Sequence, residues 1–338
     1  MAVKEFDLLC IGNAMVDVFV RGEEQAVLRH GLIRPVQHIE YEKLKEILDE
    51  CNTAPPKETT SLTVISSGGG AANAAKIAAL LGAKVCFTGA VGGDETEPDK
   101  FGQLFERDLA AAGVKLRLAL RHLPTGVCLY FKAGEETRVA ASPSAALEFS
   151  ESDISGEDVQ KAAVVVIDGF MLDRPGMVRR ILRLASQCGT IAALDLSSVA
   201  IAREHAAEIL DYIRRYSLIL FMNEAEAAAF CEAVACHNIE SLLDGKPFPV
   251  IVVKLGERGA VCYAGGTIHR SETQAVIPQD STGAGDAFCA GFLTAWIRGK
   301  TLSECAALGN KAAGIILNVT GTKADREAFN SITEYLYL

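Results

Sequence analysis

The chain has 338 residues, of which 49% are hydrophobic and 22% charged, a balance typical of a folded globular protein rather than a disordered one. The formal net charge is −10 and no dense run of lysine and arginine occurs, which argues against a nucleic-acid-binding surface. No apolar stretch approaches the roughly 20 residues of a membrane-spanning helix, and the first residues carry no signal-peptide pattern, so we expect a cytoplasmic protein without a membrane partner.

Short apolar runs alternate with helix-like segments along most of the chain. The apolar runs predict buried strands at residues 6–11, 85–89, 163–167, 191–194, 218–221 and 250–253. The segments between them predict helices at residues 71–81, 101–112, 177–187, 201–214 and 224–234, and three more helices follow at residues 284–298, 302–317 and 325–336. This alternation predicts an α/β fold with a mainly parallel central sheet flanked by helices on both faces.

Two segments interrupt the alternation. Residues 14–66 are more polar than their surroundings, and residues 116–146 alternate between apolar and polar side chains like exposed antiparallel strands. We expect both segments to form a small β lid over the carboxyl ends of the main strands, where open parallel sheets bind ligands. The whole chain, residues 1–338, is therefore predicted to form one α/β domain with a lid.

The segment most informative about function is residues 280–288, Asp-Ser-Thr-Gly-Ala-Gly-Asp-Ala-Phe. Gly283 and Gly285 remove side chains where a ligand must approach the backbone. The first amides of the helix that follows have no partner within the helix and lie at the positive end of its dipole. Such amides predict an anion hole suited to a transferring phosphoryl group.

Asp286 falls in the first turn of this helix, where a carboxylate can accept the proton of an attacking hydroxyl group. The helix N-terminus should lower the pKa of Asp286, but a loose phosphoryl-transfer transition state needs little base strength early. The alternative interpretation is an ordinary glycine turn capped by Thr282, with Asp286 complementing the helix dipole. The sequence Gly-x-x-x-x-Gly-Lys-Ser/Thr is absent, so a P-loop kinase is not supported.

Residues 280–288 resemble the C-terminal signature of the PfkB-type, or ribokinase-like, family of carbohydrate and nucleoside kinases. Three further segments are similar to motifs of that family and occur in its order: residues 67–75, 89–94 and 223–226. The resemblance extends along nearly the whole chain. It implies a ribokinase-like fold with a small β lid, and an ATP-dependent phosphotransferase that acts on an alcohol group of a sugar or a nucleoside.

The resemblance also implies roles around the anion hole. Asp286 matches the catalytic base of the family, and the amides of Gly283, Ala284 and Gly285 match its anion hole. Many relatives respond to K⁺ bound by backbone carbonyls near that hole, so K⁺ is a possible activator here. Backbone carbonyls leave no signature in a sequence.

The nucleotide side of the site is implied in the same way. Asn223 and Glu226 match the residues that organise Mg²⁺ and its waters near the phosphates of ATP, and a motif this sparse suits an ion that keeps several waters. A helix N-cap with a first-turn acid is the alternative interpretation of this pair. Thr282, Lys254 and Gly256 are further nucleotide-binding candidates, although Lys254 stands where Thr is usual in the family.

Acceptor-binding residues are expected at the turn after the first strand. Asn13 and Asp17 can hydrogen-bond vicinal hydroxyl groups there, and Asn73 can add a contact from the helix that follows Gly69. Turn chemistry alone is the alternative interpretation of Asn13. The resemblance implies that Asn13, Asp17, Gly69 and Asn73 match positions that bind a sugar or a ribose in the family.

The order Gly-Asn-x-x-x-Asp at residues 12–17 is closest to adenosine-kinase-like members. In those kinases a Gln and an aliphatic residue, here Gln37 and Ile39, lie near the base. Arg138 matches a candidate phosphate contact, and an exposed strand-edge charge is its alternative interpretation. The acceptor is therefore expected to be an adenosine-like nucleoside, with a free sugar of the ribose, fructose or ketodeoxygluconate type as the alternative.

Two further hypotheses differ in class. A catalytically silent ligand-binding regulator on the same fold would not need Asp286, Asn223 and Glu226, which are all retained. A dinucleotide-dependent oxidoreductase would need Gly-x-Gly-x-x-Gly after the first strand, which residues 12–17 do not supply. The expected partners are ATP and a small sugar or nucleoside, with no nucleic acid, and the chain is expected to be a monomer or a homodimer.

Overall fold

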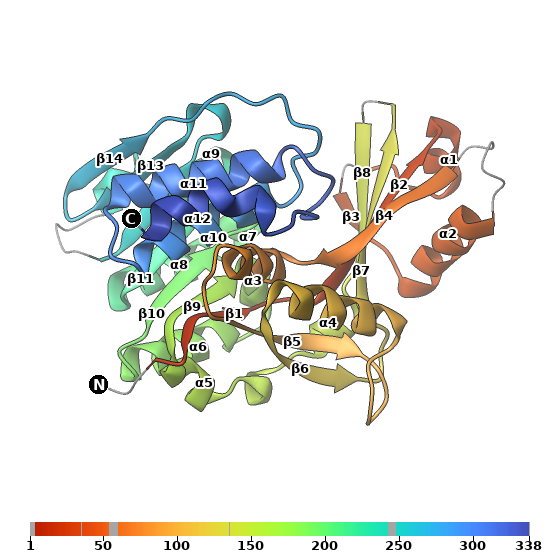
Figure 1. Cartoon of the computed structure of the whole chain (residues 1–338), viewed down its shortest axis with the longest axis horizontal. Helices are drawn as coiled ribbons and strands as arrows, with labels where there is room; N and C mark the ends of the chain where they lie inside the picture. The colour runs from red at the N-terminus through yellow and green to blue at the C-terminus, as the bar shows by residue number, and fades with distance from the viewer. Residues whose placement is uncertain (1–3, 35, 54–59, 135, 243–247, 338) are drawn as a thin grey trace.

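The computed structural model describes residues 4–34, 36–53, 60–134, 136–242 and 248–337. These residues form two β-sheets and the helices that cover them, arranged as a large body with a smaller part beside it (Figure 1). The predicted fold class is confirmed, because the larger sheet is mostly parallel and has helices on both of its faces.

Within the described residues, the main sheet has nine strands in the order β14-β13-β12-β11-β10-β9-β1-β5-β6. Their bounds are β1 (Phe6–Ile11), β5 (Val85–Gly92), β6 (Lys115–Arg121), β9 (Ala162–Asp168), β10 (Ile191–Asp195), β11 (Leu218–Asn223), β12 (Val250–Lys254), β13 (Ala260–Ala264) and β14 (Thr267–Ser271). Neighbours pair in parallel except β12 with β13 and β13 with β14, which are antiparallel. The last residues of the parallel strands therefore lie along one edge of the sheet.

Each central strand is buried on both faces because its alternate side chains enter two separate cores. In β11, for example, Ile219 and Phe221 enter one core, while Leu220 and Met222 enter the other. The first core is covered by α3 (Gly70–Leu80), α4 (Lys100–Ala112), α10 (Ala284–Trp296), α11 (Leu302–Ile316) and α12 (Asn330–Tyr337). The second is covered by α5 (Gly156–Lys161), α6 (Met177–Gln187), α7 (Val199–Glu204), α8 (Ala206–Arg215) and α9 (Glu224–Ala233).

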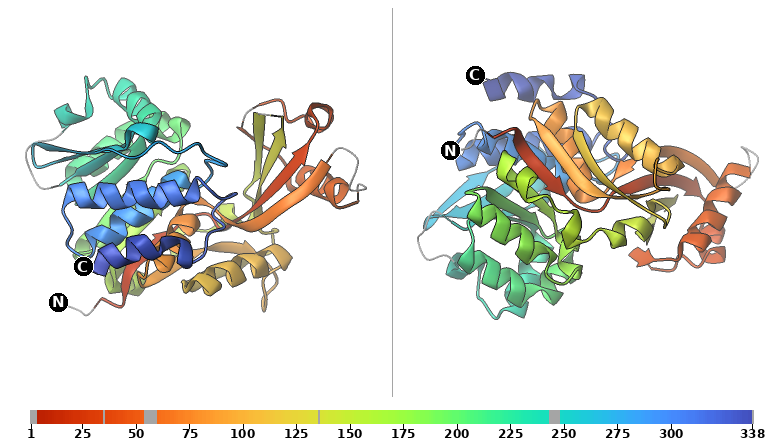
Figure 2. Two further views of the ribbon diagram at one scale, coloured as in Figure 1. Left: turned by 45° about the horizontal axis from the view of Figure 1, so that its top comes forward. Right: turned by 90° about the horizontal axis from the view of Figure 1, so that it is seen from below.

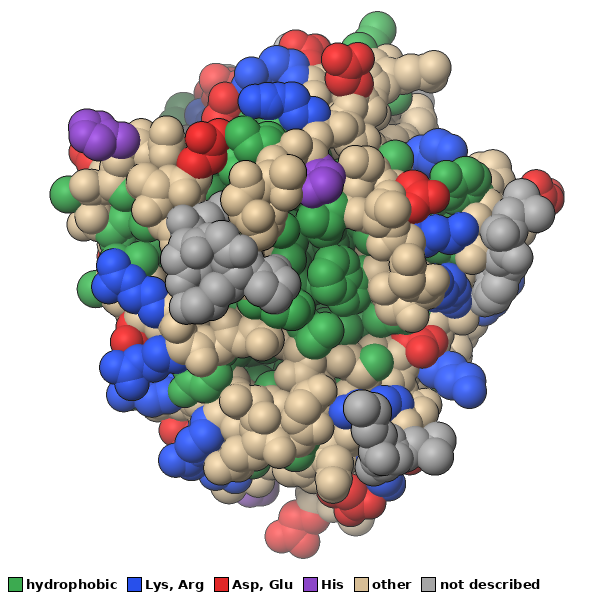
Figure 3. Space-filling view, turned by 90° about the vertical axis from the view of Figure 1, so that its left-hand side faces the viewer, with side chains coloured by type: hydrophobic (Ala, Val, Ile, Leu, Met, Phe, Trp, Pro, Cys, Tyr) green, Lys and Arg blue, Asp and Glu red, His purple; other side chains and the backbone are tan. Residues whose placement is uncertain are grey.

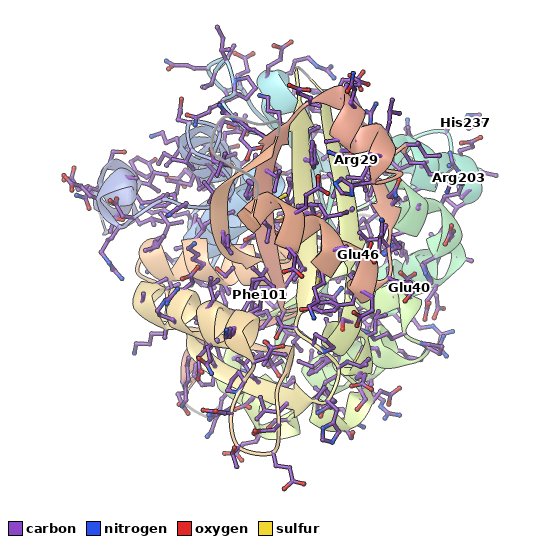
Figure 4. The ribbon with its side chains drawn as sticks, turned by 90° about the vertical axis from the view of Figure 1, so that its right-hand side faces the viewer. Arg29, Glu40, Glu46, Phe101, Arg203 and His237 are labelled. Atoms are coloured by element: carbon purple, nitrogen blue, oxygen red, sulfur yellow. The ribbon has the colours of Figure 1, made fainter. Side chains whose placement is uncertain are left out.

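The part of the chain that the structure describes also forms a second sheet of five strands, in the order β3-β8-β7-β2-β4. Their bounds are β2 (Met15–Gly22), β3 (Val36–His38), β4 (Thr60–Gly68), β7 (Gly126–Ala133) and β8 (Glu136–Ser142). Helices α1 (Glu24–Arg29) and α2 (Tyr41–Thr53) cover its outer face, where Figure 4 labels Arg29 and Glu46 in front of the strands. The sheet stands at one end of the body in two further views (Figure 2). Its strands lie in or overlap residues 14–66 and 116–146, and a lid role for it stays a prediction.

Three elements differ from the sequence-based expectation. Residues 115–121 form β6 of the main sheet rather than part of the lid, because they pair in parallel with β5 and pack against α4. At the start of this edge strand, exposed and partly buried side chains alternate, which is the pattern expected for a lid strand. The antiparallel pair β13 and β14 extends the other edge of the main sheet and was not predicted. The predicted helix at 201–214 is two helices, since the backbone leaves helical geometry at His205.

The surface of the body mixes charges of both signs. On the face turned away from the second sheet, described Lys, Arg, Asp and Glu side chains intermingle around a central area of hydrophobic side chains, with no continuous basic stripe among them (Figure 3). In the part of the chain that the structure describes, no helix combines the length and apolar character needed to cross a bilayer.

Helices α10 and α11 cross at very short range, and α10 carries the Gly-rich segment at its start. A Cβ atom on Gly291 would lie 2.7 Å from the carbonyl oxygen of Leu308 and 2.9 Å from the Cβ of Ala312. Only glycine allows this approach, so the crossing fixes how deeply α10 sits against its neighbour.

We predict that Gly291→Ala lowers the free energy of unfolding by about 1–3 kcal/mol, because the added methyl group wedges the two helices apart. Gly314→Ala in α11 is the matched control, since nothing lies within 4 Å of its Cβ position. That variant should be unchanged or more stable by roughly 0.5–1 kcal/mol, because it removes a helical glycine. Urea unfolding curves measure both, and equal stability of Gly291→Ala and the wild type would contradict the close crossing.

Candidate active site

A cleft of about 1720 Å³ opens between the second sheet and the carboxyl edge of the main sheet. Four of its lining residues are the last residues of their strands: Asp168 of β9, Asp195 of β10, Asn223 of β11 and Lys254 of β12. Side chains of the second sheet and the start of α10 close the other sides. The cleft therefore lies where a parallel sheet is expected to bind ligands.

The start of α10 presents backbone amides to this cleft. Gly283 has φ +78°, and a Cβ atom there would lie 2.3 Å from Cγ2 of Thr322, so both conformation and space require glycine. The amide of Ala284 donates a long hydrogen bond of 3.3 Å to the carbonyl oxygen of Ser281. Within the described residues, the amides of Gly283 and Gly285 make no hydrogen bond, so they are free to donate to an anion.

Asp286 is held at the cleft by a side-chain relay between α10, α3 and the chain after α11. Asn73 Nδ2 donates to Asp286 Oδ2 over 2.8 Å, and Thr322 Oγ1 donates to Asn73 Oδ1 over 3.0 Å. The other carboxylate oxygen of Asp286 faces Gly70, where a Cβ atom would lie 3.3 Å from it. Asn73 thus orients Asp286 and leaves one oxygen free toward the cleft.

The pKa of Asp286 is raised to about 7, chiefly by burial, with Asp195 and Asp168 also raising it and Asn73 and Lys254 lowering it. The expectation that the helix N-terminus would lower this pKa is therefore wrong. Desolvation in a cleft crowded with carboxylates sets the direction of the shift in this pKa.

The turn before α10 is anchored by Asp280. Its Oδ1 accepts hydrogen bonds from the amide and the hydroxyl group of Thr282, at 3.0 and 2.8 Å, and its Oδ2 accepts one from the amide of Gly321 at 2.7 Å. Thr282 lines the cleft, but its hydroxyl group is already used in this turn. Asp280 therefore sets the direction of the amides that follow.

At the end where β2 begins, the cleft is lined by Asn13, Asp17 and Gly69, and their role in binding an acceptor stays a prediction. Asp17 is 2% exposed and accepts no hydrogen bond within the described chain, so its oxygens remain available to ligand hydroxyl groups. Burial raises the pKa of Asp17 to about 8, with Asp286 and Asp280 adding to the effect.

Two residues at this end were missed by the sequence analysis. Arg174 Nη2 donates to Asn13 Oδ1 over 2.5 Å and to the carbonyl oxygen of Ala146 over 2.6 Å. Asp168 is buried at the end of β9 and accepts from the amide of Phe170 and the hydroxyl group of Ser197. Neither belongs to a recognisable motif, and only the strand-end position of Asp168 could have indicated it.

Asn223 and Glu226 form a reciprocal cap at the start of α9. Glu226 Oε1 and Oε2 accept from Asn223 Nδ2 and the Asn223 amide, and the Glu226 amide donates to Asn223 Oδ1, each over 2.8 Å. Both residues line the cleft, and burial raises the pKa of Glu226. The N-cap interpretation of this pair is therefore confirmed, and its role in organising Mg²⁺ stays a prediction.

The other nucleotide-side candidates also reach the cleft. Lys254 ends β12, and its side chain extends toward α10. Its Nζ donates to both oxygens of Asp195, at 2.8 and 3.0 Å. Gly256 lines the cleft just after β12 with φ +61°. Asp195 was not predicted, because nothing in its local sequence distinguishes it.

Three predicted acceptor contacts lie elsewhere. Gln37 turns away from the cleft and donates to the carbonyl oxygen of Gly31, and Ile39 packs against the first core. Arg138 forms an ion pair with Glu136 and does not line the cleft. Side chains of a strand alternate between its faces, so the strand positions one residue away face the cleft instead.

Those positions build an apolar wall. Val36 and His38 of β3 and Val139 of β8 line the cleft, together with Leu147 and Phe170 from the body. Phe170 is 39% exposed and Leu147 is 61% exposed, so they give the cleft apolar surface that a ligand can cover.

Comparisons with known proteins agree with this architecture. Residues 43–328 match the family described as pfkB family carbohydrate kinase. Adenosine kinase 1 of Arabidopsis thaliana is 25% identical, with the alignment covering 98% of this chain and 100% of that protein. The structure of a probable sugar kinase from Rhizobium etli CFN 42 superposes with a TM-score of 0.83, 26% identity and coverage of 99% and 98% of the two chains. Adenosine kinase from Sinorhizobium meliloti gives a TM-score of 0.81, 27% identity and coverage of 98% and 99%.

The raised pKa of Asp286 has a consequence for stability. Its ordinary value is 3.8 and its folded value is about 7, so between these pH values the folded chain binds a proton that the unfolded chain has released. The free energy of unfolding contributed by this group is therefore lost as the pH rises through 7.

We predict that Asp286→Asn, which can keep the hydrogen bond from Asn73, is more stable than the wild type by roughly 1–3 kcal/mol at pH 8 and nearly equal to it at pH 4. Urea unfolding at the two pH values measures the difference. Asp211→Asn, which changes an exposed acid of α8, is the control and should show no such pH dependence. An equal difference at both pH values would show that burial does not raise this pKa.

Proposed function

Because the chain belongs to the pfkB family of carbohydrate kinases, we propose that its cleft binds a nucleoside and transfers the γ-phosphoryl group of ATP to the hydroxymethyl group of that nucleoside. The reaction class follows from the family: the protein is a phosphotransferase with ATP as donor and a hydroxyl group of a sugar or nucleoside as acceptor. The resemblance noted from the sequence is thereby confirmed.

The observation that carries the proposed chemistry is that Asp286 and the free amides of Gly283 and Gly285 face the same cleft within one turn of α10. The acceptor oxygen attacks the γ-phosphorus while the carboxylate of Asp286 takes its proton. The bond between the γ-phosphorus and the oxygen that bridges to the β-phosphate breaks, and ADP leaves. The amides donate to the phosphoryl oxygens and stabilise the charge of the transition state.

The raised pKa suits this role. A base with a pKa near 7 is ionised in about half of the molecules at neutral pH and is stronger than an ordinary aspartate. Asn73 holds the carboxylate in place, so positioning does not depend on the ligand.

We further propose that Mg²⁺ is organised near Asn223 and Glu226. The six groups that join these residues in three hydrogen bonds are engaged with one another, which makes direct coordination by them less suited than hydrogen bonds to waters around the ion. This arrangement of Asn223 and Glu226 suits Mg²⁺, an ion that keeps several of its waters when bound. When bound, the ion would neutralise part of the phosphate charge.

The nucleoside acceptor is supported by the apolar wall rather than by Gln37 and Ile39. A free sugar offers hydroxyl groups on every side, whereas a nucleoside carries a flat apolar ring system beside its sugar. Asp17 and Asn13 are placed to accept or share hydrogen bonds with sugar hydroxyl groups, and Val36 and Val139 offer the ring system a surface beside them.

A second candidate acceptor is a sugar acid, and Arg174 favours it. This guanidinium lines the cleft and forms no ion pair among the described residues. A carboxylate on the acceptor would form one. A sugar of the ketodeoxygluconate type has this chemistry.

We predict that Asp286→Asn lowers kcat at least about 100-fold and changes the affinity for ATP by less than about 3-fold, because the carboxylate acts on the acceptor proton. Wild-type activity should rise with pH through about 7, since only the ionised carboxylate accepts a proton. Initial rates and calorimetric ATP binding measure the two effects, with Asp211→Asn as the unchanged control. Near-normal turnover of Asp286→Asn would remove Asp286 from its proposed role.

We predict that a panel of adenosine, inosine, guanosine, cytidine, ribose, fructose and 2-keto-3-deoxygluconate gives the highest kcat/KM with a nucleoside, by at least about 10-fold, because only a nucleoside covers the apolar wall. Val139→Asn should raise KM for that nucleoside and leave any free-sugar rate unchanged. A preference for ketodeoxygluconate, lost in Arg174→Met, would instead support the sugar-acid acceptor.

A further inference from the structure

Lys254 brings a charged side chain beside Gly285, whose amide makes no hydrogen bond within the described residues. Its Nζ would be 3.3 Å from a Cβ atom on Gly285, so glycine at this position is what lets the ammonium group approach the start of α10. The side chain is 15% exposed and lines the cleft. An ammonium group and an unpartnered amide are thus offered side by side to whatever occupies this corner.

Asp195 holds the ammonium group in this position. Both of its carboxylate oxygens accept from Lys254 Nζ, at 2.8 and 3.0 Å, and its Oδ2 also accepts from the thiol of Cys289 over 3.0 Å. Cys289 lies four residues after Gly285, one turn further along α10. The carboxylate is therefore fixed between β10, β12 and α10, and it fixes Lys254 in turn.

The charge of this lysine is preserved in spite of burial. Burial alone would lower the pKa of Lys254, but attraction to Asp195 outweighs it and raises the pKa above its ordinary value. An ammonium group has three donors: two bond Asp195, and Nζ also lies 3.9 Å from the sulfur of Cys289, a long and weak contact that an anion can replace. Acids dominate the rest of this cleft, with Asp168, Glu226 and Asp286 all lining it, so a cation here matters to an anionic ligand.

We propose that Lys254 is a catalytic residue that donates a hydrogen bond to the transferring γ-phosphoryl group, and that Asp195 is the positioning residue that aims it. The proposal rests on the proposed kinase function and adds a side-chain cation to the amides of Gly283 and Gly285. The lysine keeps its proton throughout, so the proton of the acceptor still passes to Asp286. Its contribution grows as the charge on the phosphoryl oxygens redistributes in the transition state.

The experiment compares Lys254→Met, Lys254→Arg and Asp195→Asn with the wild type. Lys254→Met should lower kcat about 100-fold and change the acceptor KM by less than about 3-fold. The kcat of Lys254→Arg should be higher than that of Lys254→Met, and the kcat of Asp195→Asn should lie between the values of these two variants. Lys161→Met, which breaks an exposed ion pair with Glu157, is the control and should match the wild type.

A binding measurement tests the contact without turnover. Calorimetry with ATP and with ADP, in the absence of acceptor, should show that Lys254→Met weakens ATP binding about 10-fold and leaves ADP binding unchanged, because only ATP carries the γ-phosphoryl group. Equal losses for both nucleotides, or none for either, would overturn the proposal. A further outcome is that the wild type phosphorylates none of the acceptors while Lys254→Met still binds ATP, but not ADP, more weakly than the wild type does. In that case the proposed kinase function fails, and the hydrogen bond from Lys254 to the γ-phosphoryl group is still supported.

The pH profile separates a chemical role from a structural one. The carboxyl group of Asp286 is faced by Lys254 from β12, Asp195 from β10, Asp168 from β9 and Asp17 from β2. Lys254→Met should therefore move the acid limb of kcat/KM to higher pH, and Asp195→Asn should move it to lower pH. Shifts in the same direction, or none, would mean that the pair only supports the fold.

Discussion

The hydrogen bond between Asn73 and Asp286 joins residues 213 positions apart in the chain, and the candidate active site depends on it. It brings the start of α3 against the start of α10, and Thr322 completes the link from a third segment. Two helix N-termini thus converge on one corner of the cleft, which concentrates positive dipole ends where an anion would be transferred. The main sheet supplies the other groups, because its parallel strands end along the same edge.

The charge distribution in this cleft is a consequence of that convergence. Carboxylates from β2, β9, β10 and α10 lie close enough that burial and mutual repulsion raise the pKa of Asp17, Asp168 and Asp286. Lys254 and Arg174 offset part of this charge from opposite ends. Buried carboxylates that repel one another cost free energy when no ligand is bound. Ligands that bring hydrogen-bond donors and cations reduce this cost, and such groups with shifted pKa values are common in functional clefts.

Much of the fold and of the candidate site could be predicted from the sequence, because apolar runs and the segment at 280–288 are local patterns. Gln37, Ile39 and Arg138 show the limit: the segments that hold β3 and β8 were expected to form a lid, but which face of a short strand meets the cleft depends on its partner. Asp168, Asp195 and Arg174 could not be assigned, because they acquire meaning only from neighbours distant in sequence. The burial of Asp286 reversed a pKa direction argued from the helix alone.

The chain passes between the body and the second sheet four times, and the crossings lie next to one another. Ser142 pairs with Val127, Met15 pairs with Gly126, and Met15 also pairs with Gly68 on its other side. Asn13 and Gly69 flank these crossings and line the cleft. A rotation of the small sheet would therefore turn about a narrow seam that carries Asn13 and Gly69, so it would move these two cleft-lining residues together with the sheet.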